Sequence, residues 1–158
     1  MTLRWRTVRG DELAAAELYD VLRLRSEVFV VEQQCLYQDI DGADLSEHAV
    51  HLLAHDADSL IAYARLLFGT NALSHSAPST PQARIGRVIV AGRARGRGLA
   101  RDLVRRALTE CGERWPGRVV ALSAQAHLVD FYASMGFEAL SEPYDEDGIP
   151  HVDMTLTP

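Results

Sequence analysis

Residues 88–101 have the sequence Val-Ile-Val-Ala-Gly-Arg-Ala-Arg-Gly-Arg-Gly-Leu-Ala-Arg, and this segment dictates the architecture around it. Its β-branched start predicts a strand, its Arg/Gly-rich middle predicts a turn, and its end begins a helix. Gly96 and Gly98 let consecutive backbone N–H groups turn toward one anion, and the helix N-terminus adds a partial positive charge. The arrangement is typical of a pyrophosphate-binding turn, so we expect a ligand that carries phosphates.

The helix after this turn is supported by its hydrophobic period. Leu99, Leu103, Ala107 and Cys111 recur every fourth residue, while charged residues occupy the intervening positions. An apolar stripe of this spacing is typical of an amphipathic helix that covers a core. The turn is therefore predicted to lie against a stable helix.

Positive charge gathers around the same turn. The segment 84–118 holds ten arginines and three acidic residues, although the whole chain has a net charge of −6. Such a segment favours an anionic cofactor, and the acidic remainder favours a cationic second substrate. Alternatively, helix arginines only solvate a surface, an interpretation that suits Arg105 and Arg106 better than Arg95 and Arg97.

Length and composition restrict the class of protein. A chain of 158 residues with 47% hydrophobic content predicts one globular domain over residues 1–158. We find neither a secretory signal nor an apolar run that spans a membrane, and we expect a cytoplasmic protein without membrane contact. Cys35 and Cys111 lack the spacing of a zinc or redox site, so no metal is expected. Every basic side chain is Arg, which excludes Schiff-base lysine enzymes and Walker-type phosphate loops.

Periodicity along the rest of the chain predicts a mixed α/β sheet with helices on both faces. The predicted strands are 5–8, 51–55, 60–67, 85–91, 119–123, one that begins at Phe137, and 152–156. Asp11 is expected to cap a helix that continues through Val28, and a later helix is expected over 127–135. The acidic stretch 33–47 and the polar stretch 69–82 are predicted to be loops.

Two motifs in this order resemble those of the GNAT superfamily of N-acetyltransferases. The sequence Arg95-Gly-Arg-Gly98-Leu-Ala100 is similar to the acetyl-CoA signature Arg/Gln-x-x-Gly-x-Gly/Ala, and Phe131-Tyr132-Ala-Ser-Met-Gly136-Phe137 matches a second landmark of the superfamily. Segments near Glu32, Asp39 and His151 resemble the ElaA-like branch in particular. The resemblance covers nearly the whole chain.

The resemblance implies the GNAT acyl-CoA N-acyltransferase fold. This fold has a central, mostly antiparallel mixed sheet of six to seven strands, splayed at strands four and five, with helices on both faces. Backbone groups of Val88, Ile89 and Val90 are then expected to bind the pantetheine arm, and Gln125 matches a polar position that reaches this arm. The pyrophosphate is expected to lie against Arg95, Gly96, Arg97, Gly98, Leu99, Ala100 and Arg101.

The resemblance also implies a reaction, the direct transfer of an acetyl group from acetyl-CoA to a primary amine. Tyr132 matches the general acid of the superfamily, because a phenol stays protonated at neutral pH and protonates the leaving thiolate. A packed core tyrosine is the alternative. A backbone N–H within 88–90 is expected to polarise the thioester carbonyl.

The general base stays open at this stage. The candidates are Glu32, Asp39, Asp41, His51 and His151. Imidazole has the best-matched pKa, but a lone histidine in a strand is more often structural. For Glu32 the alternative is a solvated surface carboxylate. Asp39, Asp41 and Asp44 are better suited to attracting a cationic amine than to proton transfer, and a solvated loop explains them as well.

Other functions compete with this hypothesis. One alternative is a non-catalytic CoA-binding or sensor module. Another is an enzyme that carries the acetyl group on Cys35 during transfer. Nucleic-acid binding is disfavoured because Trp115 is the only aromatic residue of the arginine-rich segment. The N-terminal pattern is also similar to acyl-homoserine-lactone synthases, except that Gln34 stands where an aromatic residue is wanted. The amine acceptor and a homodimeric state are left open.

Overall fold

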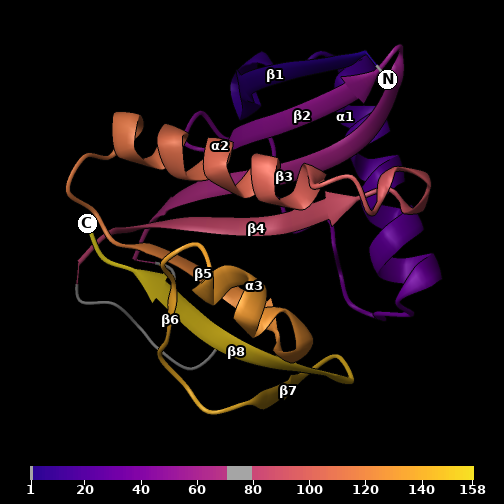
Figure 1. Cartoon of the computed structure of the whole chain (residues 1–158). Helices are drawn as coiled ribbons and strands as arrows, with labels where there is room; N and C mark the ends of the chain where they lie inside the picture. The colour runs from indigo at the N-terminus through magenta and orange to yellow at the C-terminus, as the bar shows by residue number, and fades with distance from the viewer. Residues whose placement is uncertain (1, 71–79) are drawn as a thin grey trace. The chain divides into compact units, whose positions relative to one another are not determined.

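Eight strands form one mixed sheet in the part of the chain that the structure, a computed structural model, describes, residues 2–70 and 80–158. They pair in the order β1-β2-β3-β4-β5-β8-β6, and β7 pairs with β8 (Figure 1). The strands are β1 Leu3–Arg9, β2 Val50–Asp56, β3 Ser59–Gly69, β4 Gln82–Val90, β5 Val120–Gln125, β6 Glu138–Ala139, β7 Tyr144–Glu146 and β8 Ile149–Leu156. The predicted mixed α/β class is confirmed.

Three α-helices and several shorter helical segments connect these strands. The α-helices are α1 Ala15–Arg25, α2 Leu99–Arg114 and α3 Val129–Ala133; a π-helix follows α1 at Ser26–Glu32, and 3₁₀ turns lie at Gly10–Glu12, Gly92–Ala94 and Ala126–Leu128. The chain divides into two compact units. Unit 1 comprises residues 1–66 and 87–107, and unit 2 comprises residues 67–86 and 108–158.

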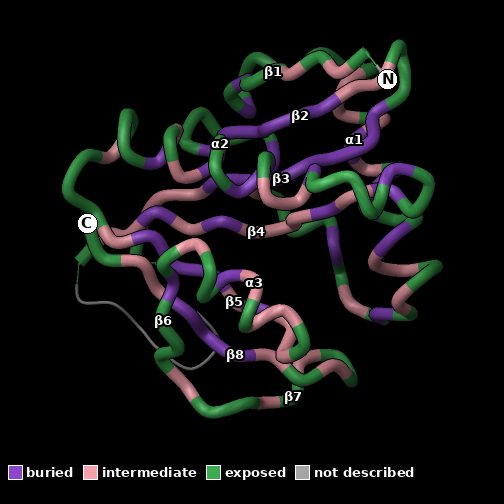
Figure 2. The backbone as a smooth tube through the Cα atoms, in the orientation of Figure 1, coloured by how far each residue is buried: buried purple, intermediate pink, exposed green. Residues whose placement is uncertain are grey.

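Within unit 1, helices cover both faces of the sheet. On one face, Val21 and Leu24 of α1 form a core cluster with strand residues such as Leu53 and Ile89. On the opposite face, Leu99 at the start of α2 belongs to a second core cluster. Its buried members are Ile61, Ala94 and Leu99, and Leu3, Trp5 and Val90 pack against them. Burial of apolar side chains on both faces explains why β2 and β3 are buried along most of their length (Figure 2).

Within unit 2, the sheet changes direction at β5. The first part of β4 pairs with β5 in parallel at two positions, Ala83 with Val120 and Arg84 with Ala121. β5 then pairs antiparallel with β8 over its whole length, from Val120 opposite Leu156 to Gln125 opposite His151. The short strands β6 and β7 both pair antiparallel with β8.

Three local expectations need correction. Asp11 does not cap the first helix, because its carboxylate accepts hydrogen bonds from the Arg9 guanidinium, and α1 begins only at Ala15. The predicted continuous helix widens into a π-helix at Ser26, a change of hydrogen-bond register that hydrophobic spacing does not reveal. Strand β7 was not expected at all. Most of the predicted loop 69–82 lies outside the described residues.

Candidate active site

The turn between β4 and α2 has the backbone expected of an anion cradle. Gly96 and Gly98 adopt left-handed φ values of +80° and +77°. A Cβ added at either glycine would meet no heavy atom within 4 Å, so the space beside both glycines is open. The N-terminal turn of α2 follows directly, with the N–H of Asp102 donating to the carbonyl of Gly98 at 3.2 Å. Open left-handed glycines before a helix N-terminus fit a diphosphate group.

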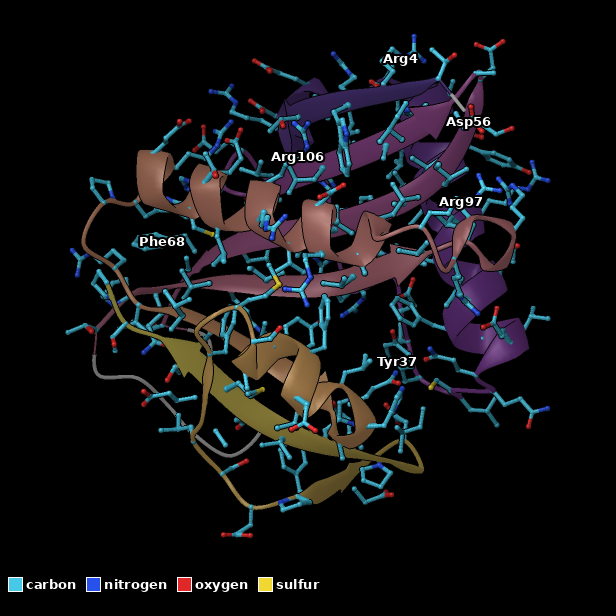
Figure 3. All side chains as sticks on the ribbon, in the orientation of Figure 1. Arg4, Tyr37, Asp56, Phe68, Arg97 and Arg106 are labelled. Atoms are coloured by element: carbon cyan, nitrogen blue, oxygen red, sulfur yellow. The ribbon has the colours of Figure 1, made fainter. Side chains whose placement is uncertain are left out.

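Two arginines of the turn differ in their surroundings. Arg97 is exposed at the bend between the two glycines (Figure 3). Arg95 braces the turn: its Nε donates to the carbonyl of Val90 at 3.0 Å and its Nη1 donates to Oε1 of Glu32 at 2.5 Å. The Arg95 guanidinium thus connects the end of β4 to the end of the π-helix.

Glu32 is therefore an ion-pair partner of the turn. Its carboxylate and the Arg95 guanidinium are both partly exposed, with side-chain accessibilities of 43% and 46%. One oxygen of the Glu32 carboxylate is occupied by the Arg95 guanidinium, which braces the turn. The pairing weakens the case for Glu32 as the general base.

His51 is completely buried in β2, and both of its ring nitrogens are engaged. Nε2 lies 2.7 Å from the carbonyl of Asp44, which can only accept, so Nε2 carries the proton. Nδ1 lies 2.6 Å from the hydroxyl of Tyr63 and accepts a hydrogen bond from it. Burial lowers the pKa of His51. This neutral imidazole has no nitrogen left for a substrate, and a structural role explains it better than general-base catalysis.

The acidic loop is an ion-pair network and not an open negative surface. Its three aspartates are bound by three arginines from α1, β3 and β4. The pairs are Arg25–Asp39 at 2.9 Å, Arg25–Asp44 at 2.6 Å, Arg65–Asp41 at 2.6 Å, Arg65–Asp44 at 2.9 Å, Arg87–Asp39 at 2.8 Å and Arg87–Asp41 at 3.3 Å. We call these six residues the Arg–Asp network.

The arginines of the Arg–Asp network lower the pKa values of two of its aspartates. Burial acts to raise the pKa of Asp41 and Asp44, but hydrogen bonds and charge from Arg65 and Arg25 outweigh it and lower both pKa values. The three carboxylates are matched by three guanidinium groups. Because arginines already pair with Asp39, Asp41 and Asp44, the negative charge of these aspartates no longer supports attraction of a cationic amine by the loop.

Tyr132 lies on α3 in unit 2 and is 6% exposed. Its ring makes edge contacts with Phe131 and Phe137, both from the second sequence motif. Burial raises the pKa of Tyr132 to about 12. The phenol therefore holds its proton at neutral pH, as a general acid requires, and the same packing would serve a core tyrosine.

Gln125 and His151 are neighbours in unit 2, opposite each other on β5 and β8. Nδ1 of His151 donates to the carbonyl of Ile149 at 2.8 Å. Nε2 lies 3.5 Å from the carboxylate of Glu146. Unlike His51, His151 keeps a ring nitrogen that no backbone carbonyl binds.

The sequence did not reveal a polar cluster beside these residues. Asp153 of β8 is completely buried, and its carboxylate accepts a 2.5 Å hydrogen bond from the Tyr144 hydroxyl. The same hydroxyl bonds Ser123 of β5. A signal was present in Asp153, an aspartate between the apolar residues Val152 and Met154, because a buried carboxylate requires partners.

No group of three or more His, Cys, Asp and Glu side chains in residues 2–70 and 80–158 is arranged to hold a metal ion. Among the same residues, no helix is long and apolar enough to cross a bilayer.

Cys111 is buried, and burial raises the pKa of its thiol to about 12. Such a thiol is a poor nucleophile.

Comparison with known proteins agrees with this geometry. The family model for the acetyltransferase (GNAT) domain matches residues 11–158. The protein ElaA of Escherichia coli is 44% identical over 152 residues, which cover 96% of this chain and 95% of ElaA.

Solved structures extend the comparison to the fold. The crystal structure of E. coli ElaA matches with a TM-score of 0.88 at 42% identity, covering 98% of this chain and 99% of that chain. An acyl-CoA N-acyltransferase from Pseudomonas aeruginosa matches with a TM-score of 0.87 at 44% identity, covering 99% and 100%. The CoA-dependent acyl-homoserine lactone synthase BjaI shares the fold alone, with a TM-score of 0.78 at 18% identity over 99% and 83%. From the domain match and the full-length similarity to ElaA, we conclude that this chain belongs to the GNAT family of acetyltransferases.

Proposed function

We propose that the protein transfers the acetyl group of acetyl-CoA directly to a primary amine. The observation that carries this proposal is the open turn of unit 1, where Gly96 and Gly98 are left-handed directly before the N-terminus of α2. The backbone amides of residues 96–101 hold the diphosphate of the cofactor, and Arg97 adds positive charge. Arg95 contributes by bracing the turn through Val90 and Glu32.

In the proposed reaction, a neutral amine attacks the thioester carbonyl. The new N–C bond forms as the carbonyl oxygen takes up negative charge, which a backbone N–H of Val88, Ile89 or Val90 stabilises. The C–S bond then breaks, and the phenol of Tyr132 gives its proton to the departing thiolate. Gln125 assists by binding the cofactor arm.

The amine must lose a proton, and we assign its removal to Nε2 of His151, directly or through water. The support is comparative: His51 has both ring nitrogens engaged, Glu32 is paired with Arg95, and Asp39 and Asp41 are bound by arginines. The imidazole of His151 is oriented by the carbonyl of Ile149, and its Nε2 lies beside Glu146 and not against a backbone carbonyl. Substitution His151→Gln is expected to lower kcat/KM for the amine.

The test is thiol release from acetyl-CoA over a panel of amines. The panel includes polyamines, aminoglycosides, amino acids and peptide N-termini, and calorimetry with CoA is run in parallel. We expect CoA uptake, and thiol release that depends on one class of amine. The corresponding N-acetyl product, detected by mass spectrometry, confirms transfer.

Three results would contradict the proposal in different ways. If folded protein takes up no CoA, the cofactor assignment is wrong. If CoA binds and no amine releases thiol, the domain is a binding or sensor module. If acetyl label remains on Cys35 or Cys111 after denaturation, transfer proceeds through a covalent intermediate. Binding of S-adenosylmethionine would favour a lactone-synthase activity instead.

A further inference from the structure

Arg87 has an unusual backbone conformation inside a strand. It lies within β4, Gln82–Val90, and its φ is +53°. This left-handed conformation is rare for a residue with a long side chain, and it persists only where the surroundings hold it. A left-handed residue in a strand interrupts the pleat and redirects the peptide groups that follow. Those groups belong to Val88, Ile89 and Val90.

The side chain of Arg87 is held at three points by the acidic loop. Its Nε donates to Oδ1 of Asp39 at 2.8 Å, and its Nη2 donates to the carbonyl of Asp39 at 3.0 Å and to Oδ2 of Asp41 at 3.3 Å. The guanidinium also lies 5.4 Å from the centre of the Tyr37 ring, from the same loop. Only 20% of the side chain is exposed.

The loop that holds Arg87 is itself fixed from the core. Arg25 of α1, which has no exposed surface, donates to the carboxylates of Asp39 and Asp44. Arg65 of β3 binds Asp41 and Asp44. The aspartates therefore cannot follow Arg87 if it relaxes, and the Arg–Asp network holds the left-handed residue against a fixed support.

We propose that Arg87 is a positioning residue for acyl transfer: its grip on Asp39 and Asp41 fixes the direction of the backbone N–H groups of residues 88–90. These are the groups that bind the cofactor arm and polarise the thioester carbonyl in the proposed function, on which this inference rests. The acidic loop then serves the acyl donor, and its carboxylates are not the binding site of the acceptor amine.

The test compares Arg87→Ala and Arg87→Lys with the control Arg6→Ala. Arg6 is also an arginine of unit 1 with two hydrogen bonds to one carboxylate, that of Glu17, but it lies on β1. Amide hydrogen exchange is measured first, without ligand. We expect exchange of the amides of residues 88–90 to accelerate about tenfold or more in Arg87→Ala, less in Arg87→Lys, and not in the control.

The second measurement reports on the thioester itself. The infrared carbonyl band of bound [1-¹³C]acetyl-CoA is expected to shift toward its free-solution frequency in Arg87→Ala, because a misdirected N–H polarises the carbonyl less. With an amine from the panel, kcat is expected to fall, and KM for acetyl-CoA is expected to rise as well, because the same backbone groups bind the cofactor arm. Arg87→Lys should restore part of both effects.

Unchanged exchange at residues 88–90 would overturn the proposal. Faster exchange with an unchanged carbonyl band would also overturn it, by showing that Arg87 only stabilises the fold. If the wild-type protein takes up no acetyl-CoA, the proposed function fails and the positioning role fails with it. The exchange data still decide whether the contact of Arg87 with Asp39 and Asp41 restrains β4. If Arg87→Ala does not fold, Asp41→Asn replaces it, because Asp41 is the more exposed partner.

Discussion

Three arginines of unit 1 are paired with the aspartates of the acidic loop. Arg65 and Arg87 interrupt apolar strands, and Arg25 follows the last apolar residue of α1. Each is buried or nearly so with aspartates as partners. A buried charge requires a partner, but residue spacing does not say which one, because the aspartates are 14 to 48 residues away in the chain.

Removal of Arg25 is expected to be severely destabilising. Arg25→Met leaves Asp39 and Asp44 without one of their two arginines, and breaking a buried ion pair costs about 3–5 kcal/mol. The free energy of unfolding is measured with urea. The matched control is Arg6→Met, which breaks the exposed pair with Glu17 and is expected to cost about 1 kcal/mol or less. Equal losses in both variants would show that the buried network contributes nothing special.

His51 makes stability depend on pH in the neutral-to-acidic range. Its folded-state pKa is lowered by burial, so below about pH 6.5 the unfolded chain binds a proton that the native state does not. The free energy of unfolding is therefore expected to decrease as pH falls from 7.5 to 5, before the aspartates titrate. His51→Gln should be less stable at every pH but should show a shallower slope. His55, whose pKa burial also lowers, supplies the slope that remains.

The substitution Tyr132→Phe tests whether Tyr132 is the general acid, because it removes only the phenolic hydroxyl. The substitution keeps the ring contacts with Phe131 and Phe137 and removes the phenolic proton. We expect kcat to fall about 100-fold or more, with CoA affinity by calorimetry almost unchanged. An unchanged kcat would assign Tyr132 to the core alone.

At the scale of elements, the turn and helix α2 were predicted most accurately. The expected helix start at Leu99 is where α2 begins, and both glycines of the turn are left-handed. This succeeded because the turn depends on local backbone freedom and the helix on a local period. The π-helix and β7 were not predicted: the π-helix is a change of hydrogen-bond register that hydrophobic spacing does not reveal, and β7 has only three residues, which pair with β8.

Gly98→Ala separates backbone strain from cofactor binding. An alanine at φ +77° is strained by about 1–2 kcal/mol, and its methyl group would enter the open side of the turn. The matched control is Gly117→Ala, past the other end of α2, with φ +74° and equally open surroundings. Both variants should lose similar unfolding free energy in urea. Only Gly98→Ala is expected to weaken CoA binding, by about tenfold or more, and equal CoA affinities would contradict the assignment of the turn.

At the scale of the whole molecule, cofactor binding and stability are coupled. A ligand at 100 times its Kd stabilises the native state by about 2.7 kcal/mol. For a chain of 158 residues this corresponds to a rise in Tm of about 5–10 °C. Thermal unfolding with CoA should show this rise, and adenosine, which lacks the diphosphate, should not reproduce it. A similar rise with adenosine would mean that the turn does not recognise the diphosphate.

The sequence by itself determined the mixed α/β class, the position of the glycine turn before α2 and the family, because these depend on local period, on glycine and on two contiguous motifs. Only the tertiary structure decided the roles of the charged residues. It paired Glu32 with Arg95, enclosed His51 between Tyr63 and Asp44, and neutralised the acidic loop with arginines from three other elements. The physical reason is that the state of a charged side chain depends on its neighbours in space and on its burial, and neither is encoded by spacing along the chain.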